Sequence, residues 1–306
     1  MARIVVSGAS GLVGRALTTA LREAGHGVFS LSRKPPAGGG EGGTAVSWDP
    51  ERGRLDPREL EGFDAVVHLA GAGIADGRWT AARRRAIRES RTRGTDLLCK
   101  ALAGLSHPPK ALLCASAAGF YGNTKPGETV TEASPPGEGF LAEVCRAWEA
   151  AAAPASAAGI RTVFLRFGVV LSPAGGMLKR VLPVFRAGLG GPLGNGRQPF
   201  PWISLEDGVR VAFHCLDGGS GLEGPVNVVA PGLATNRDFT RALGRALHRP
   251  SLIRVPGWVL RLIFGTMAEE LLLGGAAVIP GKLTASGFRF RFTNLDAALS
   301  TPVVQA

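Results

Sequence analysis

The chain begins with a short apolar run, residues 4–6, followed by three glycines at three-residue intervals: Gly8, Gly11 and Gly14. A strand that ends in such glycines turns sharply, brings backbone N–H groups close to a diphosphate and aims the next helix at that negative charge. We assign the turn to Gly8, space for the phosphates to Gly11 and close packing of the helix to Gly14. The pattern predicts a strand, turn and helix that together bind a nucleotide phosphate.

The residues after the second predicted strand, residues 28–31, indicate which dinucleotide binds. Ser32, Arg33 and Lys34 stand there, where an NAD-binding protein usually carries a carboxylate for the ribose 2′-hydroxyl. A guanidinium offers a fork of donors to the 2′-phosphate of NADP, and such a contact contributes roughly 1.5 to 3 kcal/mol. The sequence therefore predicts NADP(H) as the cofactor. The alternative is a solvated basic turn before the Gly- and Pro-rich residues 35–43.

Length and composition narrow the protein class. With 306 residues and 45% hydrophobic content, the chain can bury a full core, and we expect one α/β unit with a smaller appended lobe. Every stretch long enough to span a bilayer contains charge or proline, so we expect a cytoplasmic protein with no membrane partner. The four cysteines are far apart in the sequence, which favours buried thiols and predicts no metal site.

The net charge of +11 raises the question of nucleic-acid binding. In the densest basic segment, residues 78–93, Trp79 is followed by arginines that include Arg83, Arg84, Arg85, Arg88 and Arg91. It lacks the interleaved aromatic and base-reading residues that nucleic-acid binding by one helix requires. We therefore expect no nucleic-acid partner and interpret the segment as a solvated or subunit-facing helix.

Strands and helices alternate along the first half of the chain. Further strands are predicted at residues 64–69, 111–115 and 162–166. Helices are predicted between them at residues 81–103 and 141–152. This alternation implies an α/β fold with an open, doubly wound parallel sheet whose ligands bind at the carboxyl ends of the strands. We place the dinucleotide-binding domain at residues 1–170, with later strands free to rejoin its sheet, and a substrate lobe at residues 171–306.

Several longer motifs carry a resemblance to a known family. They are GASGLVG, HLAG, DGRWTAARRRAIRESR, ASAAGFYG, FLAEVCRAWEAAA, LRFGVVLSPAGGML and GNGRQPFPWISLEDGVR. Together they resemble the Rossmann-fold extended short-chain dehydrogenases, and more narrowly the atypical branch called epimerase family proteins, which is nucleoside-diphosphate-sugar epimerase-like. The tail at residues 249–299, with VIPGKL and SGFRFRF, is similar to the small C-terminal domain of that branch.

The resemblance implies roles for particular residues. At the cofactor pyrophosphate it implies Gly8, Ser10, Gly11, Leu12, Val13 and Gly14. At the adenosine 2′-phosphate it implies Ser32 and Arg33. Along the adenine or ribose side it implies Leu69, Ala70 and Gly71, and it implies that Arg91 reaches the cofactor. Related enzymes dimerise through the helices predicted at residues 81–103 and 141–152, so we note a possible homodimer.

The acid–base pair of the family is missing from its usual helix. Short-chain dehydrogenases use a tyrosine with a lysine one helical turn later. Tyr121 and Lys125 have that spacing here, but Gly122 and Pro126 make a helix across them improbable. The family's helical positions for the pair fall instead on Leu141 and Cys145, and neither side chain can replace it.

Three interpretations remain open from the sequence. In the first, Tyr121 and Ser116 share the proton chemistry, with Lys125 folded over from a loop. In the second, a different donor such as Glu143 or Cys145 acts, although Cys145 would need a lowered pKa. In the third, the protein is a sensor or scaffold module that binds NADP(H) without turnover. We predict an NADP(H)-dependent oxidoreductase or epimerase-like enzyme acting on a small-molecule substrate, with Ser116 and Tyr121 as catalytic candidates.

Two charged features of the second half carry further expectations. Arg166, at a strand end, is expected either to meet an anionic substrate group or to pair with an aspartate such as Asp207. Glu269 and Glu270 are adjacent, so on a helix their side chains diverge by about 100°, and we interpret them as a solvated face.

Overall fold

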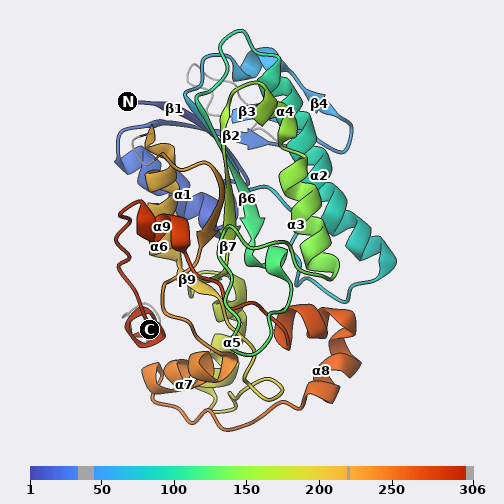
Figure 1. The fold of residues 1–306 in the computed structure, drawn as a ribbon, viewed down its shortest axis with the longest axis vertical. Coiled ribbons are helices and arrows are strands. Elements are labelled where there is room, and N and C mark those ends of the chain that lie inside the picture. The colour runs from blue at the N-terminus through green and yellow to red at the C-terminus, as the bar shows by residue number, and fades with distance from the viewer. Residues whose placement is uncertain (34–44, 219–220, 301–306) are drawn as a thin grey trace.

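A mostly parallel sheet forms the upper part of the computed structural model, which describes residues 1–33, 45–218 and 221–300 (Figure 1). The strand order is β10-β7-β6-β5-β1-β2-β3-β4, and only the β3–β4 pair is antiparallel. The strands are β1 (Arg3–Ser7), β2 (Gly27–Ser32), β3 (Ala45–Asp49), β4 (Arg54–Leu55), β5 (Ala65–His68), β6 (Ala111–Ala117), β7 (Arg161–Phe167) and β10 (Gly224–Val228). The predicted fold class is confirmed.

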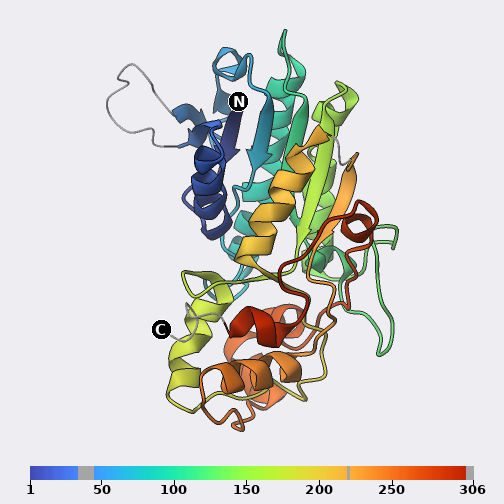
Figure 2. The same ribbon diagram turned by 90° about the vertical axis from the view of Figure 1, so that its left-hand side faces the viewer.

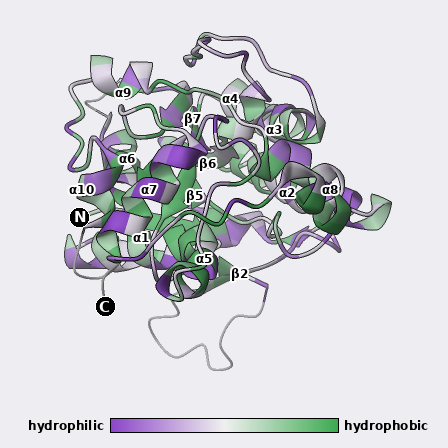
Figure 3. Ribbon diagram, turned by 90° about the horizontal axis from the view of Figure 1, so that it is seen from below, coloured by the Kyte–Doolittle hydropathy of each residue, from purple (hydrophilic) through white to green (hydrophobic). Residues whose placement is uncertain are grey.

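Helices cover both faces of this sheet, which is why its strands read as continuous apolar runs. On one face lie α1 (Leu12–Glu23) and α6 (Leu205–Leu216), and on the other α2 (Ala81–Ala103), α3 (Phe140–Ala150) and α4 (Ala153–Ala157) (Figure 1). Alternate residues of one strand enter opposite cores: Val6 packs with Leu17 of α1, and Val5 packs with Leu98 of α2. Figure 3 shows green, the colour of hydrophobic residues, at the strands in the middle of the molecule, and mixed colours along the surrounding helices.

The chain returns to the sheet after residue 170. The short strands β8 (Val169–Leu171) and β9 (Trp202–Ser204) pair with each other in parallel, and they frame α5 (Gly176–Arg186). The chain then forms α6 over α1 and adds β10 beside β7 at the sheet edge. The strands predicted at residues 64–69, 111–115 and 162–166 correspond to β5, β6 and β7 to within two residues.

A lower lobe lies beyond the carboxyl ends of the strands (Figure 2). It contains α5, α7 (Asn236–Ala246), α8 (Gly257–Phe264), the single π-turn η4 (Ala268–Leu272) and α10 (Leu295–Leu299). The segment α9 (Gly281–Ala285) runs back and packs on β10. Two 3-10 turns, η1 (Pro57–Leu60) and η2 (Ala118–Tyr121), belong to the sheet region.

The composition led to expectations about membrane-spanning helices, metal sites and cysteines. Across residues 1–33, 45–218 and 221–300, no helix has the length and apolarity needed to cross a membrane. The same residues contain no cluster of three or more side chains able to hold a metal ion. All four cysteines are buried and free, as expected.

Candidate functional site

The glycine turn between β1 and α1 depends on the absence of side chains. Gly8 has a φ of 70°, in the left-handed region that favours glycine. A Cβ on Gly8 would lie 2.8 Å from the carbonyl carbon of Leu69, and a Cβ on Gly14 would lie 2.1 Å from the carbonyl oxygen of Gly8. Gly8 therefore brings the ends of β1 and β5 together, and Gly14 lets α1 begin directly against the turn. Gly11 is exposed.

The first turn of α1 presents uncapped backbone donors. Gly11 stands at the N-cap, so no side chain caps the helix, and the first turn contains no acidic residue. Ser10 is exposed in the turn, while Leu12 and Val13 are half-buried behind it. Because a helix N-terminus carries partial positive charge, these N–H groups suit an anion bound against the turn.

A basic side chain stands one strand away from this turn. Ser32 ends β2, which pairs with β1, and Arg33 follows it. The Arg33 guanidinium lies 3.6 Å from the Glu51 carboxylate, and both side chains are well exposed, at 69% and 81%. Such an exposed pair contributes little stability, so Arg33 can exchange Glu51 for a phosphate. Lys34 and residues 35–43 lie outside the described residues.

Ser7 joins the carboxyl ends of β1 and β5. Its hydroxyl oxygen accepts hydrogen bonds from the N–H groups of Leu69, at 3.1 Å, and Ala70, at 3.3 Å. Since two donors use both lone pairs, the hydroxyl proton points to His68 Nδ1, 2.7 Å away. The predicted adenine or ribose wall, Leu69 to Gly71, is thereby held beside the glycine turn.

His68 extends this network into the core. Because Nδ1 accepts the Ser7 proton, the proton of the neutral imidazole resides on Nε2, which donates to Thr95 Oγ1 at 3.0 Å. Trp148 Nε1 donates to the same oxygen, also at 3.0 Å. The side chain of His68 is fully buried, and burial lowers its pKa to about 4. The neutral ring therefore ties β1, β5, α2 and α3 together beneath the glycine turn.

Arg91 brings a second cation to the same edge of the sheet. A Cβ on Gly71 would lie 3.3 Å from Arg91 Cζ, and the guanidinium lies 4.9 Å from the centroid of the Trp148 ring. Its Nη1 donates to the carbonyl of Ile87 at 3.1 Å. Burial lowers the pKa of Arg91, and no carboxylate of the described residues forms an ion pair with it. A partly buried cation without an acidic partner fits an anionic ligand.

Tyr121 is buried, and its hydroxyl is engaged on both sides. The residue ends η2, so no helix connects it to Lys125, which is exposed. Its hydroxyl donates to Asn227 Oδ1 at 2.7 Å and accepts from Arg166 Nη1 at 2.8 Å. The ring is 3% exposed, and burial raises the pKa of Tyr121. This geometry favours a positioning role; a catalytic role for Tyr121 stays a prediction.

Arg166 at the end of β7 pairs with Glu149 of α3. Its Nε and Nη2 donate to the two carboxylate oxygens at 2.8 Å each, a bidentate pair whose side chains are 4% and 12% exposed. The pairing expected with Asp207 was wrong. Asp207 lies in the first turn of α6, where it accepts hydrogen bonds from Arg210 and from the backbone N–H groups of Arg291 and Phe292.

Ser116 shares the same carboxylate. The Ser116 hydroxyl donates its proton to Glu149 Oε1 at 2.7 Å. The lone pairs of Ser116 Oγ can therefore accept a proton from another group. The sequence interpretation missed Glu149. The signal was present, because Leu141, Cys145 and Glu149 recur at four-residue steps and therefore share one face of α3.

The alternative donors on α3 are poorly placed for proton transfer. Burial raises the pKa of the Cys145 thiol to about 11, whereas a reactive cysteine requires a lowered pKa. Glu143 is exposed. Leu141 lies in an apolar cluster with Phe140, Phe264 and Leu271, which joins α3 to α8 and η4.

Glu270 corrects the expectation of a solvated pair. Its two carboxylate oxygens accept from the N–H groups of Phe140, at 3.1 Å, and Leu141, at 2.8 Å. A carboxylate at this point satisfies two free donors of α3 and complements the helix dipole. Only Glu269 is solvated, and it pairs with Arg261 on the surface. The partners of Glu270 lie 130 and 129 residues away, so no local pattern announces this contact.

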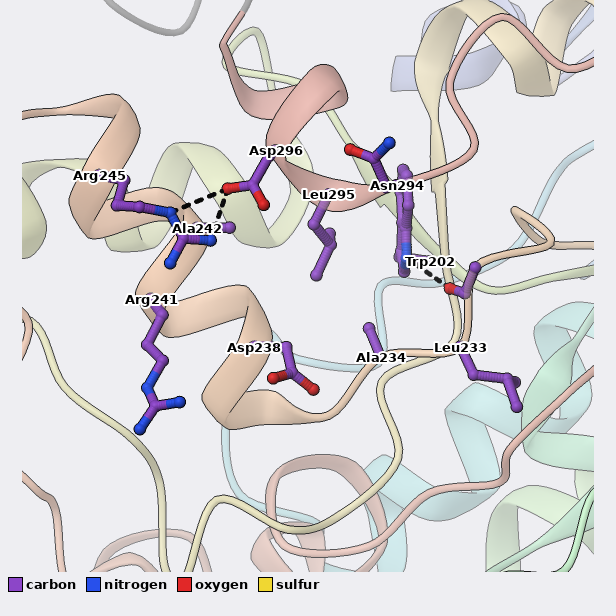
Figure 4. Close-up of a pocket in the computed structure, with 11 residues that line it drawn as sticks. Trp202, Leu233, Ala234, Asp238, Arg241, Ala242, Arg245, Asn294, Leu295 and Asp296 are labelled. Carbon is purple, nitrogen blue, oxygen red and sulfur yellow. Dashed lines mark hydrogen bonds and ion pairs between the residues drawn. The ribbon is translucent and has the colours of Figure 1, made fainter.

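A shallow pocket of about 240 Å³ lies elsewhere, in the lower lobe (Figure 4). It is lined by residues of α7 and by the segment around Asn294, and none of the predicted site residues contributes to it. Figure 4 shows Arg245 turned to Asp296, with which it forms an ion pair, while Arg241 extends away from that carboxylate.

Comparisons with known proteins agree with this geometry. The model of the NAD dependent epimerase/dehydratase family matches residues 4–229, and a domain of unknown function, DUF1731, matches residues 255–301. Epimerase family protein MT2273 of Mycobacterium tuberculosis is 45% identical over 296 residues, which cover 97% of this chain and 96% of that protein.

Two solved structures align with nearly all of this protein's residues. The crystal structure of human epimerase family protein SDR39U1 (isoform 2) with NADPH is 37% identical, has a TM-score of 0.88 and aligns over 97% of this chain and 98% of that chain. The nucleoside-diphosphate sugar epimerase from Corynebacterium glutamicum is 36% identical, with a TM-score of 0.80, and the alignment covers 99% of this chain and 58% of that chain. With its glycine turn, its parallel sheet and these relatives, the chain belongs to the NAD dependent epimerase/dehydratase family.

Proposed function

We propose that this protein is an NADP(H)-dependent oxidoreductase that acts on a carbonyl or hydroxyl group of a small molecule. The observation that carries the proposal is the glycine turn, whose uncapped helix donors lie one strand away from Arg33. Arg91 adds a cation without an acidic partner on the opposite side of β1. The human relative crystallised with NADPH supports the same cofactor.

The cofactor contacts follow from where these groups lie. The N–H groups of Leu12 and Val13 in the first turn of α1 would hold the diphosphate, because the Gly11 N–H is donated to the Gly8 carbonyl within the turn. Ser32 with Arg33 would hold the 2′-phosphate. The backbone from Leu69 to Gly71 would line the adenosine side. All of these groups lie at the carboxyl edge of the sheet, where ligands bind in folds of this class.

We assign the proton chemistry to Ser116 and Glu149. A bound nicotinamide supplies or accepts the hydride, and the protein must then move one proton at the substrate oxygen. In alcohol oxidation, Ser116 Oγ takes the proton of the substrate hydroxyl while its own proton passes to Glu149 Oε1, 2.7 Å away. In carbonyl reduction the same two protons move in reverse. Arg166 and Tyr121 are positioning residues, because they hold the carboxylate in place.

Calorimetry with NADPH and NADH tests the cofactor assignment. Arg33→Ala is expected to weaken NADPH binding by roughly 10- to 150-fold, the equivalent of 1.5 to 3 kcal/mol, because it removes the phosphate contact. NADH binding should stay unchanged. Arg52→Ala, which removes another exposed arginine, is the matched control and should leave both affinities unchanged. No heat with NADPH, or tighter binding of NADH, refutes the assignment.

Turnover of NADPH with a panel of carbonyl compounds and sugar nucleotides tests the chemistry. Ser116→Ala is expected to lower kcat about 10²- to 10⁴-fold without weakening NADPH binding, because it removes the proton relay. Tyr121→Phe should lower kcat far less. Equal losses in both variants would contradict the relay. If the wild-type protein binds NADPH but turns over nothing on the panel, the result favours the alternative, a module that binds NADP(H) without turnover.

A further inference from the structure

The exposed hydrophobic side chains of this molecule are concentrated in one part of it. Among the described residues, nine large hydrophobic side chains are exposed, and apart from Met1 all of them lie between Val184 and Ile263. The most exposed are Leu252 at 83%, Leu262 at 71% and Trp258 at 66%. A monomeric protein surface normally scatters such residues, so a concentration of them marks a contact surface.

Six of these side chains form what we call the lower apolar surface: Leu189, Leu252, Ile253, Trp258, Leu262 and Ile263. The loop after α5 lies beside the turn before α8, because the N–H of Ile253 donates to the carbonyl of Gly190 at 3.1 Å. Trp258 and Leu262 are one helical turn apart on α8. Figure 3, which views the molecule from below, shows α5, α7 and α8 on this side.

The same stretch of chain is strongly basic. Residues 239–268 contain five arginines and one histidine and no aspartate or glutamate. Leu252 shares an open, shallow depression with Arg241, Arg245 and Arg249. Arg241 and Arg249 form no ion pair within the described part of the chain. Cations therefore border Leu252, the most exposed of these apolar side chains, directly.

This combination identifies the chemistry of the partner. A second copy of the chain would place the patch against itself, and its arginines would face arginines at a cost. An anionic lipid surface satisfies both components, because phosphate headgroups neutralise the arginines while tryptophan and leucine side chains enter the boundary of the acyl region. We propose that the lower apolar surface docks on the headgroups of an anionic bilayer.

The proposal concerns peripheral contact and not insertion. The expectation of no membrane partner rested on the absence of a spanning segment, and a surface of short elements needs none. The docked bilayer would lie below the lobe, at the opposite end of the molecule from the amino ends of the strands (Figure 2). The proposal does not depend on NADP(H) binding, which involves other residues.

Co-sedimentation of the full chain with vesicles tests the proposal. We expect binding to phosphatidylglycerol vesicles, little binding to phosphatidylcholine vesicles, and loss of binding as salt rises to about 0.5 M, where charges are screened within a few ångströms. Arg241→Glu with Arg249→Glu should weaken binding at least tenfold. Trp258→Ser with Leu262→Ser should do the same, since it removes the apolar component.

A matched control keeps the net charge change the same. Arg85→Glu with Arg88→Glu alters two exposed arginines of α2 and should retain most of the vesicle binding. All variants change exposed side chains. Their melting temperatures and their affinities for NADPH should therefore equal those of the wild-type protein. Equal losses in the α2 control and the Arg241/Arg249 variant overturn the proposal, as does absence of binding to anionic vesicles at low salt. A dimer in solution that Trp258→Ser with Leu262→Ser dissolves, without vesicle binding, overturns it in favour of a second copy.

Discussion

The two sides of the cofactor edge differ in how their polar groups are used. On the phosphate side, formed by the ends of β1 and β2 and the start of α1, the first turn of α1 has neither a side-chain cap nor an acidic residue, and Arg33 has only an exposed ion pair with Glu51. On the reaction side, formed by the ends of β6 and β7 with α3, the polar side chains are paired with one another, as Ser116, Glu149, Arg166 and Tyr121 are. Free donors suit a bound anion, whereas a closed network suits fixed geometry for proton transfer.

This difference predicts that the phosphate side determines ligand binding and that the reaction side contributes to the stability of the fold. Substitutions on the phosphate side should change ligand binding more than folding, because the first turn of α1 is uncapped and the ion pair of Arg33 is exposed. Substitutions on the reaction side should change folding strongly, because each leaves another buried group unpaired. Four experiments, in order of expected effect, test this contrast.

The largest effect is expected from Arg166→Met. It leaves the Glu149 carboxylate buried without its guanidinium, which costs about 3 to 5 kcal/mol of unfolding free energy. Urea denaturation followed by circular dichroism measures the change. Lys100→Met removes an exposed partner of Asp96 and is the control, with little change expected. A loss for Arg166→Met no larger than that of the control contradicts the closed network.

The second effect concerns pH and the residue between the two sides. His68 is neutral in the folded protein, with a pKa of about 4, whereas in the unfolded chain it titrates near its ordinary value of 6.5. The unfolded state therefore binds a proton first as pH falls, and unfolding free energy should drop by about 3 kcal/mol between pH 6.5 and pH 4. Denaturation at a series of pH values, compared with His68→Gln, measures this. Identical slopes for the two proteins contradict the neutral buried ring.

Gly14→Ala tests the phosphate side. The added Cβ would meet the Gly8 oxygen at 2.1 Å, so the helix must shift, at a cost of about 1 to 3 kcal/mol. The affinity for NADPH should fall as well. The loss of binding free energy should exceed the loss of unfolding free energy. Gly104→Ala at the end of α2 is the control, since its Cβ would approach nothing closer than 3.7 Å. Normal NADPH affinity in Gly14→Ala would show that the turn does not shape the diphosphate site.

The smallest effect is expected from Glu270→Gln. The neutral amide keeps one acceptor for the two N–H groups that begin α3 and loses the interaction of the charge with the helix dipole, about 1 kcal/mol. Glu269→Gln changes the neighbouring carboxylate, which pairs only on the surface, and should cost less. The comparison is made by urea denaturation. A larger loss for Glu269→Gln than for Glu270→Gln contradicts the capping role.

Much of the fold could be predicted because its determinants are local. A strand buried on both faces is a continuous apolar run, and β5, β6 and β7 were located for that reason. The glycine turn could be predicted because Gly8 and Gly14 are required by sterics within a few residues of chain. Tyr121 could be excluded from a helix because Gly122 and Pro126 follow it.

The reaction side could not be predicted in the same way. Its contacts join distant segments: Tyr121 and Asn227 are 106 residues apart, and Glu270 lies about 130 residues from α3. Charge complementarity alone suggested Asp207 as the partner of Arg166, but which carboxylate is nearest depends on how α3 packs on the sheet. Glu149 was within reach, because a count of four from Cys145 arrives at it.

The Glu270 cap has a consequence for how this chain can be divided. The two family models separate residues 4–229 from residues 255–301, as if they were interchangeable modules. The carboxylate that completes α3 belongs to the second module, and so does Phe264 in the cluster around Leu141. A fragment cut at residue 250 would expose that cluster and leave the two N–H groups that begin α3 without their carboxylate, so the two segments should be expressed and engineered as one unit.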